Sequence, residues 1–128
     1  MSRPVRPRRS VLYMPGSNPR ALEKGRGIPA DGLILDLEDA VAPEAKETAR
    51  GQIRDALKAG GYGRREIVVR VNGLATPWGR DDLAHAGGFG ADAILLAKVE
   101  SADAVRQAEA ILSAHGASRD LPIWCMIE

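Results

Sequence analysis

Short apolar runs alternate along the chain with stretches of helical periodicity. The apolar runs predict five β-strands, at residues 11–14, 33–37, 67–71, 93–97 and 122–127. The segments between them predict four helices, which cover residues 19–24, Pro43 to the Gly60-Gly61 pair, 80–86, and Ser101 to Gly116. Strands joined by helical crossovers run parallel, with right-handed connections. The pattern therefore predicts an α/β fold with a parallel sheet.

Five strands leave two architectures open. A closed eight-stranded barrel needs about 250 residues, so this chain could supply only part of one. A flavodoxin-like open sheet accepts five strands, but it normally ends with a helix that covers the sheet, and this chain stops directly after a strand. We therefore expect either the N-terminal part of a longer β/α protein or a sheet whose exposed edge another chain covers.

Length and charge restrict the class of protein. The 128 residues predict one domain, and 18 basic residues nearly cancel 17 acidic ones, which argues against a nucleic-acid partner. No stretch approaches the roughly 20 apolar residues of a membrane span, and the N-terminus lacks the apolar core of a signal peptide. The single cysteine, Cys125, argues against a disulfide framework. We expect a cytoplasmic protein.

Several polar segments have simple structural interpretations. Residues 1–9 carry four arginines and predict a solvated basic arm ahead of the domain at 10–128, which near a site entrance would attract an anionic substrate. The charged residues after Pro43 predict a solvated helix face. Lys98 and Glu100 predict ion pairs or helix capping, and the isolated His85 and His115 predict surface positions. The residues interpreted in this way are Arg3, Arg6, Arg8 and Arg9 in the arm, and Glu44, Lys46, Glu47, Arg50 and Arg54 in the helix.

Three acids follow the second apolar run. Asp36, Glu38 and Asp39 come directly after Gly32–Leu35, at the carboxyl end of a strand buried on both faces. Carboxylates this close repel one another by roughly 1 kcal/mol per pair in water and by more when they are partly buried. We therefore expect a metal ion or an arginine beside them. The alternative is a helix start, because acids stabilise a helix N-terminus and Pro43 suits its first turn.

Arg70 interrupts an apolar strand, and Glu128 ends the chain directly after the last one. A buried arginine needs an anionic partner, so Arg70 is interpreted either as a bidentate clamp for a substrate carboxylate or carbonyl, or as an internal ion pair with Asp36 or Glu38. Alternation places Arg70 on the same face as Asn72. Glu128 is a candidate ligand for Mg²⁺, which prefers oxygen ligands. The alternative is a strand-terminal acid in solvent.

Four motifs in order resemble the citrate lyase beta subunit and malyl-CoA lyase branch of the HpcH/HpaI aldolase family. They are RSVLYMPGS at 9–17, LDLEDAVAP at 35–43 with Lys46 and Ala49-Arg50, VRVNG at 69–73, and KVES at 98–101. The resemblance implies a (β/α)₈ TIM barrel, of which this chain holds about the first five β/α units. It also implies a Mg²⁺-dependent carbon–carbon lyase that acts through an enolate on a malyl-, citramalyl- or citryl-type acyl-CoA thioester.

The resemblance also implies roles for single residues. Arg70 would bind the oxo-acid and stabilise enolate charge, and Glu128 would be one of two protein ligands of Mg²⁺, the second being an aspartate beyond this chain. The acids Asp36, Glu38 and Asp39 would order Arg70 and the waters of the metal. Tyr13 and Lys24 match positions that line a coenzyme A site.

The resemblance implies partners as well. These are an acyl-CoA or acyl-carrier thioester and a small oxo-acid, with a homotrimer or homohexamer as the assembly. Two other functions stay open: a malyl-CoA-type thioesterase, and a non-catalytic truncated relative that acts as a binding module.

Overall fold

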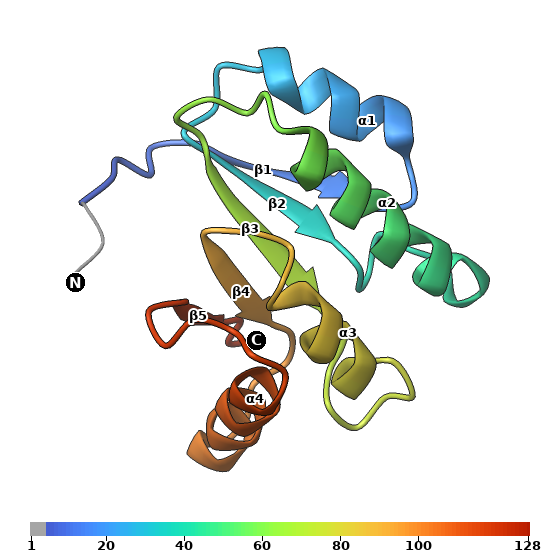
Figure 1. The fold of residues 1–128 in the computed structure, drawn as a ribbon, viewed down its shortest axis with the longest axis vertical. Helices are drawn as coiled ribbons and strands as arrows, with labels where there is room; N and C mark the ends of the chain where they lie inside the picture. Colours follow the sequence, from blue (N-terminus) through green and yellow to red (C-terminus); the bar gives the residue numbers. More distant parts are fainter. Residues whose placement is uncertain (1–4) are drawn as a thin grey trace.

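The structure, a computed structural model, describes residues 5–128 and consists of alternating strands and helices (Figure 1). The predicted strands and helices are all present, and most ends lie within a few residues of expectation. Among residues 5–128, no helix is long and apolar enough to cross a membrane. The elements are β1 (Val11–Pro15), α1 (Pro19–Lys24), β2 (Gly32–Asp36), α2 (Lys46–Ala59), β3 (Glu66–Val71), α3 (Gly79–Ala86), β4 (Ala93–Leu96), α4 (Ala102–Ala114) and β5 (Ile123–Cys125), with short 3₁₀ helices at Gly25–Gly27 and Pro43–Ala45.

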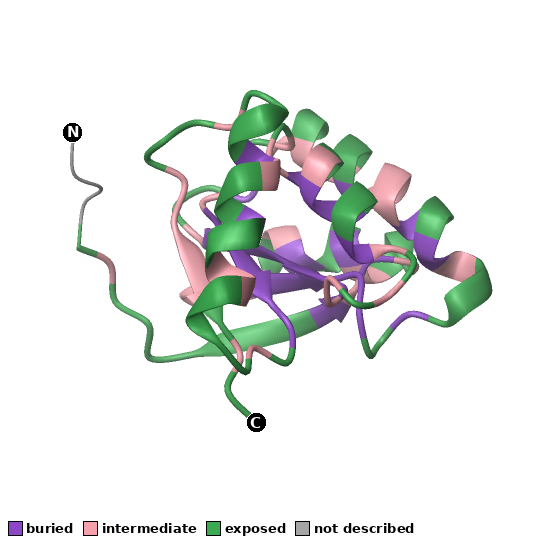
Figure 2. Cartoon of the chain, turned by 90° about the horizontal axis from the view of Figure 1, so that it is seen from below, coloured by how far each residue is buried: buried purple, intermediate pink, exposed green. Residues whose placement is uncertain are grey.

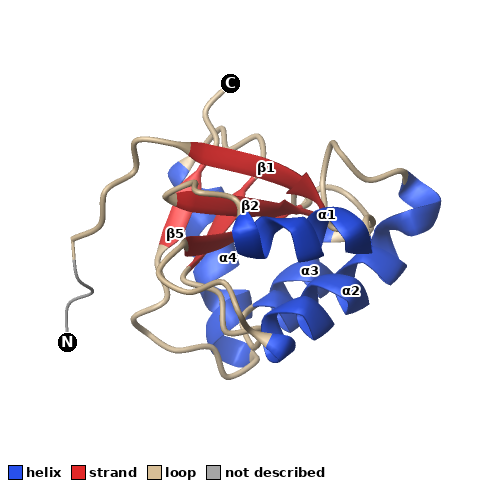
Figure 3. Ribbon diagram, turned by 90° about the horizontal axis from the view of Figure 1, so that it is seen from above, coloured by secondary structure: helices blue, strands red, loops and turns tan. Residues whose placement is uncertain are grey.

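The five strands are parallel and lie in the order β1-β2-β3-β4-β5. Each crossover therefore advances by one strand in the same direction, and right-handed connections place the helices on one face of the sheet (Figure 3). A flavodoxin-like sheet reverses direction and has helices on both faces. The fold is thus α/β with the winding of a (β/α)₈ barrel, of which residues 5–128 hold five strands and the four α-helices that connect them.

Alternation along the strands divides the apolar residues between two faces. One cluster, which includes Leu33, Leu35 and Val69, packs against the helices. A smaller cluster on the other face contains Ile34 and Val68. The central strands are buried on both sides, whereas the first three residues of β1 are exposed (Figure 2). The sheet is therefore open at its β1 edge.

Two helix starts follow the capping chemistry of the sequence. The Asn18 side chain accepts a hydrogen bond from Ala21 N, and the Ser101 hydroxyl accepts one from Ala104 N. The last strand is shorter than predicted, but Met126 N still donates to Leu96 O, so backbone pairing continues beyond Cys125.

The described part of the basic arm, residues 5–9, does not lie near the carboxyl ends of the strands. Its described arginines form ion pairs with acids at the opposite, amino-terminal ends of β2, β3 and β4, and Arg8 also lies 5.0 Å from the centroid of the Trp124 ring. Arg8 and Arg9 are exposed, as expected for a solvated arm, although both are held by ion pairs. The alternative of a position at a site entrance is wrong for these residues. The boundary at residue 9 stays a prediction, and Arg3 lies outside the described residues. The pairs are Arg6–Asp92, Arg8–Glu66 and Arg9–Asp31.

We expect Arg8→Ala to lower the melting temperature more than Arg9→Ala. Arg8 makes two hydrogen bonds to Glu66, whose buried side chain would lose these donors, whereas the Asp31 side chain is more exposed and can turn to solvent when Arg9 is lost. Thermal unfolding at low and high salt would check this. High salt should reduce the fall in melting temperature caused by Arg9→Ala and leave the fall caused by Arg8→Ala unchanged. Equal effects for the two variants would contradict it.

Candidate functional site

Asp36 and Arg70 form the centre of the candidate site. Asp36 is the last residue of β2, and Arg70 is next to the last residue of β3. The two are paired in the register of these strands, which brings their side chains together. Arg70 Nε donates to Asp36 Oδ1 and Arg70 Nη2 to Asp36 Oδ2, both over 2.7 Å, and Asp36 is 0% exposed. The internal ion pair is thus confirmed, and the role of Arg70 as a substrate clamp stays a prediction.

The backbone after β2 also holds Asp36. Glu38 N donates to Asp36 Oδ1 over 2.8 Å and Ala40 N donates to Asp36 Oδ2 over 2.9 Å. Burial alone would raise the pKa of Asp36, but the Arg70 guanidinium and the two N–H donors outweigh it and hold the pKa below its ordinary value. Asp36 is therefore ionised at neutral pH and suited to orient Arg70, not to carry a proton. The alternative of a helix start is met only in part: a 3₁₀ helix begins at Pro43 and leads into α2, but Asp36 and Glu38 lie before it and bind cationic side chains.

Glu38 lies between two cations. Its Oε1 is 3.4 Å from Arg70 Nη1, and its Oε2 accepts a hydrogen bond from Lys98 Nζ over 3.3 Å. Lys98, at φ +52° after β4, also lies 3.9 Å from Asp39 Oδ1. Burial and the neighbouring Asp39 raise the pKa of Glu38 against the opposing effect of Lys98 and Arg70. The expected arginine lies beside Asp36 and Glu38, and Lys98 lies beside Glu38 and Asp39.

Tyr13 joins this site, and Lys24 does not. The Tyr13 ring covers the Arg70 guanidinium at 4.8 Å from its centroid, so β1 contributes a cation–π contact. Lys24 is exposed at the end of α1 and lines a surface hollow with Asn18 and Arg20. That part of the chain is free to meet a ligand that extends out of the site, but coenzyme A binding by Tyr13 and Lys24 stays a prediction.

Glu128 is exposed just beyond β5. It contributes, after Glu38 and Asp39, to raising the pKa of Lys98, so it belongs to the same rim. Within residues 5–128, no three His, Cys, Asp or Glu side chains come together as a metal cluster. The exposed carboxylate of Glu128 suits Mg²⁺, whereas Asp36 and Glu38 already bind cationic side chains. The exposure of Glu128 fits a strand-terminal acid in solvent equally well, so its role as a Mg²⁺ ligand stays a prediction.

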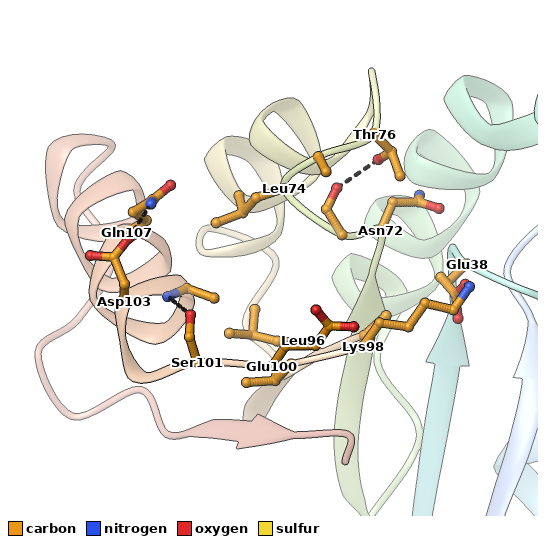
Figure 4. A pocket seen from close by; sticks show the side chains of 15 residues that line it. Glu38, Asn72, Leu74, Thr76, Leu96, Lys98, Glu100, Ser101, Asp103 and Gln107 are labelled. Carbon is orange, nitrogen blue, oxygen red and sulfur yellow. Dashed lines mark hydrogen bonds and ion pairs between the residues drawn. The ribbon is translucent and has the colours of Figure 1, made fainter. Parts of the chain in front are cut away.

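A cleft of about 540 Å³ opens beside Glu38 and Lys98. One wall is the loop after β3, with Leu74 and Thr76, and the other is the start of α4 (Figure 4). Leu96 and Val99 contribute to its apolar lining. The cleft has room for a ligand group next to the acids.

A group of polar side chains that the sequence pattern does not predict to be buried lies behind the acids. We name Lys46, Arg50, Asn72 and Asp82 the polar brace. Lys46 and Arg50 were interpreted as a solvated helix face, which is wrong: Lys46 is 6% exposed, and Arg50 forms an ion pair with Asp82, which is 0% exposed. Their spacing of four residues places them on one side of α2, but helical periodicity alone does not show that polar partners from α3 and β3 lie there.

The chain is similar in sequence to two enzymes of Cereibacter sphaeroides. The chain is 48% identical over 128 residues to a (3S)-malyl-CoA thioesterase of Cereibacter sphaeroides (strain ATCC 17025), covering 100% of this chain and 43% of the relative. It is 43% identical over 132 residues to an L-malyl-CoA/beta-methylmalyl-CoA lyase of Cereibacter sphaeroides (strain ATCC 17029), covering 98% of this chain and 42% of the relative. The chain thus spans less than half the length of these relatives.

The fold is similar to that of a solved structure. The crystal structure of protein CitE from Mycobacterium tuberculosis with magnesium, acetoacetate and coenzyme A superposes with a TM-score of 0.69 at 28% identity, covering 91% of this chain and 38% of CitE. The model of the HpcH/HpaI aldolase/citrate lyase family matches residues 9–128. With its sequential parallel strands and its Arg70–Asp36 pair at their carboxyl ends, the chain belongs to the HpcH/HpaI aldolase/citrate lyase family.

Proposed function

We propose that the enzyme containing this chain is a Mg²⁺-dependent carbon–carbon lyase of malyl-type CoA thioesters. The observation that carries the proposal is the Arg70 guanidinium, which is locked by Asp36 at the carboxyl ends of the strands and lies beside Glu38. Magnesium and coenzyme A are present with CitE, and one relative is a malyl-CoA lyase, which supports this choice of metal and substrate.

The residues of this chain would act mainly through charge and position. Arg70 uses Nε and Nη2 on Asp36, and its Nη1 edge, near Glu38, keeps donor capacity for a carboxylate or enolate oxygen. Tyr13 covers the guanidinium and restricts its movement. Glu128 would be the ligand from this chain to Mg²⁺, which when bound acts as a Lewis acid on the oxo-acid carbonyl. Tyr13 and Lys24 are proposed to meet the coenzyme A portion of the substrate.

A second candidate is hydrolysis of the same thioester. It is favoured by the higher identity to the malyl-CoA thioesterase, 48% against 43% for the lyase. Both reactions need an anchored thioester and a polarised carbonyl, so Arg70 and Glu128 serve either one. They differ in which bond breaks and in the products.

The test is a product analysis with the complete enzyme and malyl-CoA. A lyase gives acetyl-CoA and glyoxylate, whereas a thioesterase gives malate and free coenzyme A. We expect the lyase products in the presence of Mg²⁺ and loss of turnover with EDTA, restored by added Mg²⁺. Malate with free coenzyme A would establish the second candidate. If neither malyl-, citramalyl- nor citryl-CoA is turned over, a non-catalytic binding module remains, and isothermal titration with coenzyme A would test it.

The assembly is also proposed from family likeness. Strands β1 and β5 form the two edges of the sheet, and further β/α units or a second subunit must pair with them in the complete protein. We propose a homotrimer or homohexamer, which sedimentation of the complete enzyme would check. An acyl-carrier thioester remains an alternative form of the substrate.

A further inference from the structure

Lys46, the first residue of α2, is a buried charge that the proposed reaction does not use. Its Nζ donates to the carbonyl oxygens of Leu37 over 3.0 Å and of Glu38 over 2.9 Å. The same ammonium lies 5.1 Å from the centroid of the Trp78 ring. Two carbonyls and an aromatic face therefore replace the water that a lysine normally keeps.

The rest of the polar brace ties the same turn to α3. Asn72 Nδ2 donates to Leu37 O over 2.8 Å and to Asp82 Oδ2 over 2.6 Å. Asp82 Oδ1 accepts hydrogen bonds from Arg50 Nε and Nη2, over 3.1 and 2.8 Å. The turn after β2 is thus held from α2 by Lys46 and, through Asn72, from α3.

The held turn is the one that presents Glu38 to the site. Leu37 N donates to Arg70 O over 2.9 Å, and Glu38 N donates to Asp36 Oδ1. The amides of the turn therefore bind groups of the site, while its carbonyls bind the brace. A shift at the carbonyls would move the Glu38 carboxylate away from Arg70 Nη1 and Lys98 Nζ.

We propose that Lys46 is a positioning residue of this site, which fixes Glu38 beside Arg70 and Lys98 by holding the Leu37 and Glu38 carbonyls. Without the ammonium, Leu37 O keeps its bond from Asn72, and Glu38 O keeps only the bond from Val41 N. The turn loses its link to the start of α2. The effect on turnover rests on the proposed function, but the effect on the turn does not.

The first test measures amide hydrogen exchange in the complete enzyme, with Lys46→Met as the variant. The control is Lys58→Met, the same change at an exposed position in the last turn of α2. We expect amides of residues 37–41 to exchange about tenfold faster in Lys46→Met, with α4 unchanged in both variants. Unchanged protection of residues 37–41, or an equal acceleration of α4, would overturn the proposal, because Lys46 would then have no local role.

The second test separates positioning from folding. Loss of an outer partner of an active-site group typically lowers activity about 10–100-fold, so we expect that fall in kcat for Lys46→Met. We expect KM for the thioester to stay within about twofold, because the interaction lost is not one with bound substrate. An unchanged kcat despite a loosened turn would overturn the positioning role. Absence of turnover in the unaltered enzyme would count against the proposed function alone, and the exchange comparison would still decide whether Lys46 holds the turn.

Discussion

Replacing Arg70 by methionine is expected to lower the free energy of unfolding by about 3–5 kcal/mol, because it leaves the fully buried Asp36 carboxylate without its cation. The same change should lower turnover of the complete enzyme by about 10²–10³-fold, the usual loss when one donor to a developing oxyanion is removed. Urea unfolding and a kcat measurement on the folded variant would give the two effects separately.

A double variant distinguishes the two roles of Arg70. Combining Arg70→Met with Asp36→Leu removes both charges, and replacement of a buried ion pair by apolar residues is often neutral for stability. We expect the double variant to be more stable than Arg70→Met but less stable than the unaltered protein, because Glu38 N and Ala40 N lose their acceptor, and we expect no recovery of turnover. Turnover restored together with stability would show that Arg70 serves only the fold.

The same pair predicts a dependence of stability on pH. Because the folded pKa of Asp36 is lowered, its contribution is present above the unfolded value of about 3.9 and is lost as the pH falls through the lower folded pKa. In Arg70→Met, burial is no longer opposed by the guanidinium, so the pKa of Asp36 should rise. Protonation of Asp36 then favours the folded state, so the stability lost in Arg70→Met should be smaller near the unfolded pKa of about 3.9 than at neutral pH, which urea unfolding at the two pH values would check.

Substitution of Gly79 by alanine is expected to destabilise the protein by about 3 kcal/mol, at the upper end of the usual effect of overpacking. A Cβ at this first residue of α3 would lie 2.2 Å from Gly73 O and 2.9 Å from Asn72 O. Both neighbours are backbone atoms, which cannot turn away as a flexible side chain would. The movement would also reach Asn72, a member of the polar brace.

Gly51→Ala is the matched control. Gly51 is inside α2, and the nearest atom to an added Cβ is Arg54 Nη2 at 3.7 Å, which is ordinary contact. Alanine is favoured over glycine inside a helix by about 1 kcal/mol, so this variant should be more stable than the unaltered protein. Thermal unfolding of both variants would check that Gly79→Ala lowers the melting temperature and that Gly51→Ala raises it. A small effect of Gly79→Ala would show that the loop after β3 yields more easily than its contacts indicate.

The alternation of apolar runs and helices determined the α/β class, because strand and helix periods are local properties of the chain. The helix caps Asn18 and Ser101 could also be predicted from the sequence, because each side chain accepts a hydrogen bond from an N–H only three residues away. Whether the sheet is wound as a barrel or as an open flavodoxin-like sheet depends on strand order. That order results from packing between distant segments, and it was decided by the structure.

The candidate site divides in the same way. The sequence placed Asp36, Glu38 and Arg70 at the carboxyl ends of parallel strands and required a cation near the acids, because charge and strand direction follow from residue type and period. The choice of Asp36 as the bidentate partner needed the register of β2 against β3.

Only the tertiary structure could place the residues whose partners are distant in sequence. The sequence pattern predicts that the charged side chains of the arm and of α2 lie in solvent. In the structure, Arg8 binds a buried glutamate at the amino-terminal end of the sheet, and Lys46 lies beneath the turn that presents Glu38. A charged side chain is buried when several elements together supply its hydrogen-bond partners, and one element's periodicity carries no information about the others.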